Sequence, residues 1–265
     1  MNIFKREMRA NLKSLIVWSL SMVMLIGAGM GKFSSTSGAS AEMTELISSL
    51  PNSLKAMFGF GNFDLSKAIG FYAILYLYII VMGAIHAAML GAGIISKEER
   101  DKTTEFLIVK PIKRHTIITN KMLAAFVNVI ILNVITFSVS YKMVSMFTLD
   151  ASLFGQIGMM MFGLFMIQLI FLTIGAAFAA INRNSKKAPV LATSTILIAY
   201  FLNMAVQLSG NLSFLKYFTP FQYFTADSIL NEGTISIGYV VLSIIIMVGM
   251  LTVTYSRYEK RDLMV

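Results

Sequence analysis

The amino-acid sequence predicts an all-α, polytopic membrane protein with six transmembrane helices. Of the 265 residues, 57% are hydrophobic and only 13% are charged, whereas a soluble domain carries about 25% charged residues. The mean hydropathy is +0.74. The charged residues lie between long apolar runs, and a run of about 20 apolar residues is long enough to cross the hydrocarbon core of a bilayer. We therefore expect residues 1–265 to form a single transmembrane domain.

The six predicted spans are apolar runs without any Asp or Glu. They cover residues 14–33, 71–95, 122–147, 153–181, 189–208 and 237–255. The fourth run, at about 1.5 Å per residue, is about 43 Å long and exceeds the core of about 30 Å, so we expect it to tilt or to project into the cytoplasm. In the first run, Gly27-x-Gly29-x-Gly31, which includes a Gly27-x-x-x-Gly31 pair, predicts a face on which another helix packs closely.

The distribution of Lys and Arg predicts the orientation of the chain. Seventeen of the 22 Lys and Arg residues fall before the first span, between the second and third, between the fourth and fifth, or after the sixth. Because cytoplasmic segments carry an excess of Lys and Arg, we expect both termini in the cytoplasm.

Residues 1–13 combine basic residues with an apolar stripe. Phe4, Met8 and Leu12 recur every four residues, which would put them on one face of a helix. Such a segment suits a helix that lies in the inner membrane surface. The alternative is a basic flank that only orients the first span.

Residues 96–121 form a dense charged segment in an otherwise apolar chain. The segment holds seven Lys or Arg residues and four acids. Because each charge costs roughly 2.5–3.5 kcal/mol at the centre of a membrane helix, we expect this segment to lie in water between the second and third spans. Ser96-x-x-Glu99 fits a capping box that would start a helix, and Pro111 would stop that helix.

Two interpretations of this segment are open on physical grounds. Phe106 and Leu107 are adjacent apolar residues within a short amphipathic stretch, so a capped helix would insert them into a groove on a partner protein. The alternative is a solvated connector whose charges follow the positive-inside rule.

The segment contains the pattern Glu99-Arg100-x-x-Thr103-x-Glu105-x-Leu107-x-x-x-Pro111-x-x-Arg114, followed by Lys121. This pattern resembles the cytoplasmic loop of ABC-2 type transporter permeases, in which a coupling helix docks on the ATP-binding subunit. Lys102 stands where the family often has Gly. The resemblance implies that the coupling residues of this chain are Glu99, Arg100, Thr103, Thr104, Glu105, Phe106, Leu107, Pro111, Arg114 and Lys121.

The resemblance also implies a function and partners. A permease of this family moves its substrate out across the bacterial cytoplasmic membrane and is not itself an enzyme. It carries no cofactor, because ATP and Mg bind to a separate ATPase subunit. A second copy of the permease, or a homologous permease, completes the membrane part. Residues 1–13 resemble the interfacial elbow helix of the family, and residues 218–224 resemble the outer half-helices before the last span.

Other classes of protein fit the sequence less well. A secondary transporter would need carboxylates within its spans, and an intramembrane enzyme would need paired polar groups, of which only His86 is present. The basic residues lie beside spans and form no groove with aromatic residues, which argues against nucleic-acid binding. The absence of Cys excludes disulfides and thiolate metal sites. A membrane scaffold or immunity protein stays open as an alternative, because it needs no special residues.

Three of the polar residues inside the predicted spans are candidates for a functional role. His86 lies in the second span, and Asn128 and Asn133 lie in the third. Polar groups within a membrane are costly, so these residues are candidates for an intramembrane polar site. The alternative is that each side chain forms hydrogen bonds across a helix interface and has no further role.

Overall fold

The computed structural model describes residues 3–36, 45, 49–51, 54–55, 63–101, 113–148, 150–182, 184, 186–208 and 210–260. Within these residues, six helices are long and apolar enough to cross a membrane, as predicted. They are α1 (Ile3–Thr36), α4 (Ala68–Arg100), α6 (Arg114–Ser145), α7 (Leu153–Ile181), α8 (Lys187–Leu208) and α9 (Ile237–Glu259). Each contains one predicted span, except that α6 ends at Ser145, just before the predicted end.

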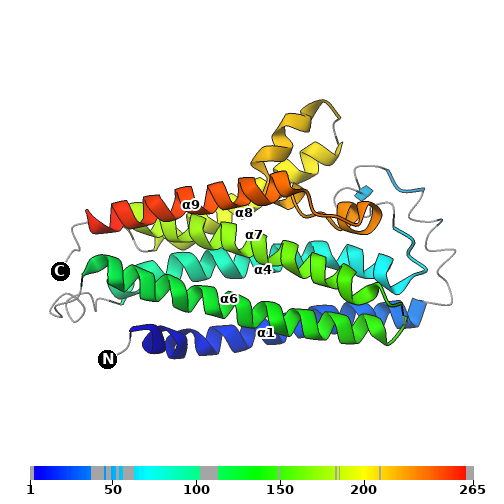
Figure 1. Ribbon diagram of the computed structural model, residues 1–265, viewed down its shortest axis with the longest axis horizontal. Helices are drawn as coiled ribbons and strands as arrows, with labels where there is room; N and C mark the ends of the chain where they lie inside the picture. Colours follow the sequence, from blue (N-terminus) through cyan, green and yellow to red (C-terminus); the bar gives the residue numbers. More distant parts are fainter. Residues whose placement is uncertain are drawn as a thin grey trace.

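Figure 1 shows the six helices side by side along the long axis of the molecule. α4 and α7 lie in the middle of the bundle, α1 and α6 lie on one side of them, and α8 and α9 lie on the other. Both chain termini lie at the same end of the bundle. We name this the terminal end; it carries the first turns of α1 and α6 and the last turns of α4 and α9. The opposite end is the far end.

The centre of the bundle is a close contact between α4 and α7. A Cβ atom at Gly91 would lie 2.1 Å from the Leu172 carbonyl oxygen, and one at Gly175 would lie 2.3 Å from the Ala88 carbonyl oxygen. Because lipid chains are as apolar as the side chains, membrane helices associate largely through such van der Waals packing. Both helices carry further buried alanines, namely Ala84, Ala87 and Ala92 on α4 and Ala176, Ala179 and Ala180 on α7.

One local prediction from the sequence is confirmed only in part, and one is wrong. A Cβ atom at Gly29 would lie 2.5 Å from the Leu75 side chain of α4, so this glycine does lie at a close contact. Among the described residues, a Cβ atom at Gly31 would meet nothing within 4 Å and one at Gly27 would meet the flexible end of Met143 at 3.7 Å, so the pair spaced four apart marks no close contact there. Ser96 does not start a helix but lies within α4, where its hydroxyl donates to the Ala92 carbonyl oxygen at 2.7 Å. The serine satisfies its own hydroxyl one turn back in the helix and caps nothing.

α1 runs from Ile3 to Thr36 as one continuous helix, so its amphipathic first turns join the first span without a break. Its fully or nearly buried residues follow one stripe of the helix surface and are Glu7, Leu15, Met22, Ile26, Met30 and Phe33. α1 packs against α6 and α4. The position of residues 3–13 in the membrane surface stays a prediction.

Between α8 and α9, the chain forms three short helical turns. They are η2 (Gly210–Phe218), η3 (Pro220–Gln222) and η4 (Ser228–Glu232). η2 packs against α8 (Figure 1). The Thr219 hydroxyl donates to the Ala199 carbonyl oxygen of α8 at 2.8 Å, which brings the chain back onto the bundle. Gly233 ends η4 with φ 67°, a left-handed conformation that glycine adopts at little cost.

We expect Gly91→Ala to destabilise the protein and Gly93→Ala to leave its stability unchanged or slightly raised. A methyl group at position 91 would overlap the Leu172 carbonyl, so α4 and α7 would have to separate, and overpacking of this kind costs about 1–3 kcal/mol. Position 93 has open space around it, and alanine favours a helix more than glycine does. Thermal unfolding of both purified variants in the same detergent measures the difference. Equal unfolding temperatures would contradict the close contact.

Candidate functional site

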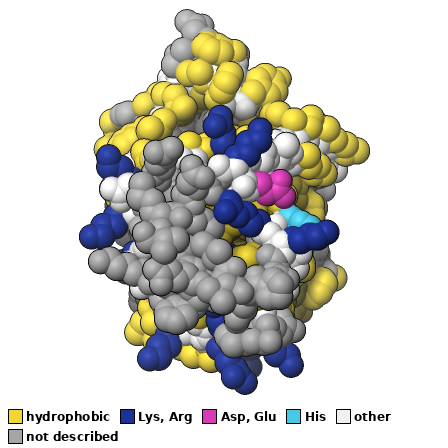
Figure 2. Space-filling view, turned by 90° about the vertical axis from the view of Figure 1, so that its left-hand side faces the viewer, with side chains coloured by type: hydrophobic (Ala, Val, Ile, Leu, Met, Phe, Trp, Pro, Cys, Tyr) yellow, Lys and Arg dark blue, Asp and Glu magenta, His cyan; other side chains and the backbone are white. Residues whose placement is uncertain are grey.

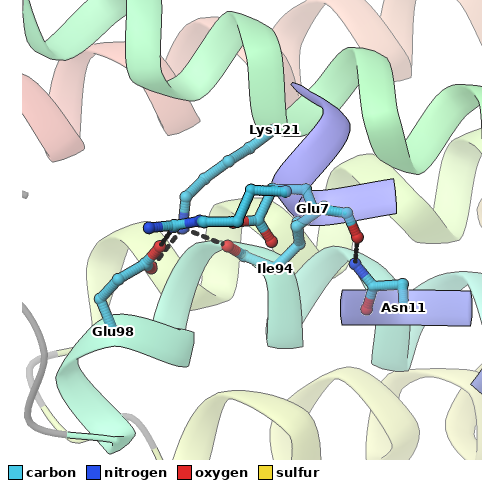
Figure 3. A network of polar contacts seen from close by, with 6 residues as sticks. Glu7, Asn11, Ile94, Glu98 and Lys121 are labelled. Carbon is cyan, nitrogen blue, oxygen red and sulfur yellow. Dashed lines mark hydrogen bonds and ion pairs between the residues drawn. The ribbon is translucent and has the colours of Figure 1, made fainter. Parts of the chain in front are cut away.

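Four charged side chains from three helices meet at the terminal end of the bundle (Figure 3). They are Arg6 and Glu7 of α1, Glu98 of α4 and Lys121 of α6, and we name them the charge network. Glu7 and Lys121 are fully buried, and Glu98 is 5% exposed. Such burial is rare for charged residues unless they are paired.

Lys121 and Glu98 occupy positions on the buried faces of their helices. In α6, Lys121 lies four residues after Ile117 and three before Ala124, and all three are buried. Residues three or four apart share one face of a helix, so Lys121 lies on the packed face of α6 although it is charged. Glu98 extends the buried stripe of α4 in the same way, four residues after Ile94.

The ammonium group of Lys121 has two partners on α4. It donates to the Ile94 backbone oxygen at 2.6 Å and forms an ion pair with Glu98 Oε2. Figure 3 shows Lys121 reaching across to both oxygens. The ion pair joins the end of α4 to the second turn of α6, and these are the two helices that flank residues 101–113.

Arg6 adds α1 to the network. Its Nη2 atom donates to Glu98 Oε1 at 2.6 Å and to Glu7 Oε1 at 2.8 Å. The Arg6 side chain is 33% exposed, so its guanidinium enters the network from the surface. One turn further along α1, Asn11 donates to the Glu7 backbone oxygen at 2.9 Å. The first turns of α1 are thereby attached to α4 and, through Glu98, to α6.

The network balances two positive charges with two negative charges. Taking an ion out of water costs several kcal/mol, and attraction to a partner offsets this cost only when the pairing is good. Glu98 accepts from both Arg6 and Lys121, so both of its oxygens are paired. Glu7 Oε2 has no hydrogen-bond partner in the part of the chain that the structure describes. Moving one of the three helices would leave a buried charge unpaired, so the network holds them in one relative position.

The structure separates the predicted coupling residues. Glu99 and Arg100 lie in the last turn of α4, where Arg100 Nε pairs with Asp101 Oδ1 at 3.2 Å. Arg114 begins α6 and donates to the Glu259 backbone oxygen of α9 at 3.0 Å. Lys121 belongs to the charge network. The remaining predicted residues lie outside the described residues and are Thr103, Thr104, Glu105, Phe106, Leu107 and Pro111.

Glu7 is not among the site residues predicted from the sequence, although the sequence contains a signal for it. Glu7 is the one acid in residues 1–41, within a basic segment. It lies three residues after Phe4 and four before Asn11, so it shares the face of the apolar stripe and not the basic face. A charged residue at a packed position on each of three helices would have indicated mutual pairing.

The polar residues predicted inside spans contact different helices. Asn128 donates to a methionine sulfur of α1 at 3.2 Å, and Asn133 donates to Gln168 Oε1 of α7. Both asparagines therefore bond across helix interfaces, as one of the two interpretations expects. The ring of His86 packs edge-on against Trp18 of α1, with 5.4 Å between the ring centroids. A functional role for these three residues stays a prediction.

A cavity of about 440 Å³ lies at the far end. α4, α8 and the turns after η2 enclose it, and its wall combines aromatic rings with amide side chains. The residues that line it include Phe63, Tyr76, Asn203, Gln207, Gln222 and Phe224. Next to this wall, burial raises the pKa of Tyr223 to about 12, so its hydroxyl stays protonated and donates to the Tyr217 carbonyl oxygen. A cavity with this mixture of walls suits a small amphipathic ligand.

We expect Glu98→Gln and Lys121→Met each to destabilise the protein by about 3–5 kcal/mol, because the first leaves the buried ammonium of Lys121 without its carboxylate and the second leaves Glu98 with Arg6 alone. The double variant should be less destabilised than the sum of the two, since it removes both charges of the pair. The exposed pair Arg100 and Asp101 is the control, and Arg100→Gln should cost at most about 1 kcal/mol. Thermal unfolding in detergent measures the loss of stability in the two single variants, the double variant and Arg100→Gln. Strict additivity of Glu98→Gln and Lys121→Met would show that the two residues do not interact.

The comparison with known protein families agrees with this architecture. The family model described as "ABC-2 family transporter protein" matches residues 1–263. No curated protein sequence matches the chain. Membrane subunits of this family are multi-pass and generally non-catalytic, and the family implies an ABC ATPase partner. Because the match covers nearly the whole chain and the structure supplies six helices that are able to span a membrane, the chain belongs to the ABC-2 transporter family.

Proposed function

We propose that this chain is the permease subunit of an exporter that moves substrate out across the bacterial cytoplasmic membrane. The observation that carries the proposal is the charge network, because it joins both helices that flank residues 101–113 to α1. A separate ATPase chain would bind ATP and Mg and would dock on residues 101–113. A second copy of this chain, or a homologous permease, would form the other half of the membrane part.

A movement of residues 101–113 would be transmitted to the membrane helices through two residues of the charge network, Glu98 of α4 and Lys121 of α6. Glu98 lies two residues before the end of α4, and Lys121 lies about two turns into α6. Because the buried charges do not tolerate the loss of a partner, a displacement of the loop would shift α4, α6 and α1 together. ATP binding and hydrolysis on the partner would then favour one or the other of two arrangements of the bundle.

The terminal end would face the cytoplasm. Figure 2 looks onto this end and shows Lys and Arg side chains spread over it. An excess of Lys and Arg beside membrane spans marks the cytoplasmic side. The far end would then face outward, and its cavity, whose walls combine aromatic rings and amide groups with the carboxylate of Asp227, would suit an amphipathic cargo on its way out.

The first test of this function concerns coupling. Phe106→Ala combined with Leu107→Ala should abolish most co-purification of the ATPase and its transport-stimulated hydrolysis, because apolar anchors typically contribute about 2 kcal/mol or more each to an interface. The matched control is Phe214→Ala with Phe218→Ala, two exposed aromatic residues at the far end. The control should leave both readouts unchanged. Wild-type co-purification and hydrolysis in the Phe106 and Leu107 variant would mean that the loop is only a connector.

The second test concerns topology. The chain contains no Cys, so Ser37→Cys, Lys102→Cys and Asn211→Cys each introduce a single thiol. In intact cells, a membrane-impermeant thiol reagent should label positions 37 and 211 and should label position 102 only after the membrane is opened. Labelling of position 102 in intact cells would overturn the orientation.

A further inference from the structure

An apolar groove runs between α6 and α9, with α7 as its floor. Its volume is about 330 Å³. In Figure 1, α6 and α9 lie on opposite sides of α7. Leu172 and Thr173 of α7 are buried beneath the groove, and the Thr173 hydroxyl is satisfied by the Ile170 carbonyl oxygen at 2.8 Å. The residues of the two walls are Met122, Leu123 and Phe126 on α6 and Met247 and Leu251 on α9.

The groove is closed at the terminal end by a hydrogen bond between its walls. Thr119 Oγ1 of α6 and Tyr255 Oη of α9 lie 2.9 Å apart. From Thr119 to Phe126 the α6 wall is roughly 10 Å long, at about 1.5 Å per residue. An apolar groove of this length and volume can hold a stretch of hydrocarbon chain, and the Thr119–Tyr255 hydrogen bond crosses it at the terminal end.

Positive charge surrounds the closed end. Lys113 and Arg114 lie at the start of α6, and Arg257 and Lys260 lie at the end of α9. Glu259 is the acid among them; it lies four residues after Tyr255 on the same face of α9, and its backbone oxygen accepts from Arg114. Figure 2 shows this excess of Lys and Arg side chains over the terminal end. An apolar groove that ends beneath a basic cluster matches a molecule with a hydrocarbon tail and an anionic head.

We propose that this groove binds one anionic phospholipid from the leaflet at the terminal end. One acyl chain lies along the α7 floor between α6 and α9, and the phosphate lies beyond the hydroxyl pair against the four basic side chains. The bound lipid fills the space between α6 and α9, and both helices pack against its acyl chain. The inference does not depend on an ATPase partner or on the direction of transport.

Brominated phospholipids, which quench tryptophan on contact, test the site. Trp18 is the single tryptophan, so Trp18→Phe combined with Phe126→Trp places one reporter on the groove wall. Trp18→Phe with Leu197→Trp is the matched control on the exposed surface of α8. Positions 126 and 197 are 37% and 56% exposed, so both variants should fold. Each protein is reconstituted with mixtures of brominated phosphatidylglycerol or brominated phosphatidylcholine and unbrominated phosphatidylcholine.

At position 126, phosphatidylglycerol should bind about fivefold or more tightly than phosphatidylcholine, which is the preference expected from one or more basic residues near an anionic head. At position 197 the two lipids should bind equally. Adding Arg257→Gln and Lys260→Gln should lower the preference at position 126, and Lys113 and Arg114 would retain part of it. Inorganic phosphate should not displace the lipid, since it has no chain to fill the groove.

Three results would overturn the proposal. An equal preference at positions 126 and 197 would mean that anionic lipids gather around the whole basic end without a defined site. The absence of quenching by either lipid at position 126 would mean that protein covers the groove. Displacement of the brominated lipid by inorganic phosphate would mean that the basic cluster binds the anion alone.

Discussion

The bundle depends on the contact at which the backbones of α4 and α7 touch. In a bilayer, lipid chains are as apolar as leucine, so burying apolar surface does little to bring two helices together, and close packing must do so. Gly91 and Gly175 allow each backbone to approach the carbonyl groups of the other helix. The other helices are arranged around this pair, with α1 and α6 on one side and α8 and α9 on the other. α4 consequently supplies Glu98 at the terminal end and Tyr76 in the wall of the far cavity.

The charge network constrains the bundle in a different way from the glycine contact. Van der Waals packing weakens gradually as helices separate, whereas a buried charge either has its partner or bears a large desolvation cost. The sequence assigns Glu98 and Lys121 to a charged segment in water, because a count of charges carries no information about partners. Arg6 and Glu98 are 92 residues apart in the chain, so only the folded bundle shows that they pair. The local signal of this pairing was that each charged residue occupies a position on the packed face of its helix.

The spans were predictable because each must supply about 20 apolar residues in a row, a requirement that the sequence displays directly. Which helices touch was not predictable. Gly27 and Gly31 have the spacing of a packing motif, yet the close contact uses Gly91 and Gly175, and no local pattern shows which helix lies opposite. The capping box at Ser96 failed for a related reason. An existing helix extends more easily than a new one starts, so α4 continues through Ser96 to the end of its charged turn.

The length of α1 has a mechanical consequence. Its 34 residues, at about 1.5 Å per residue, make a rod of about 51 Å in a bilayer core of about 30 Å. Near its middle, Trp18 rests against His86 of α4. Because the charge network joins α1 to α4 and α6, the three helices would tilt together, and a common tilt of about 6° around that level would displace the two tips of α1 by about 3 Å in opposite directions, given a half-length of about 25 Å. α1 would then act as a lever. A displacement of its charged first turns at the terminal end would produce a displacement of its last turns in the opposite direction at the far end.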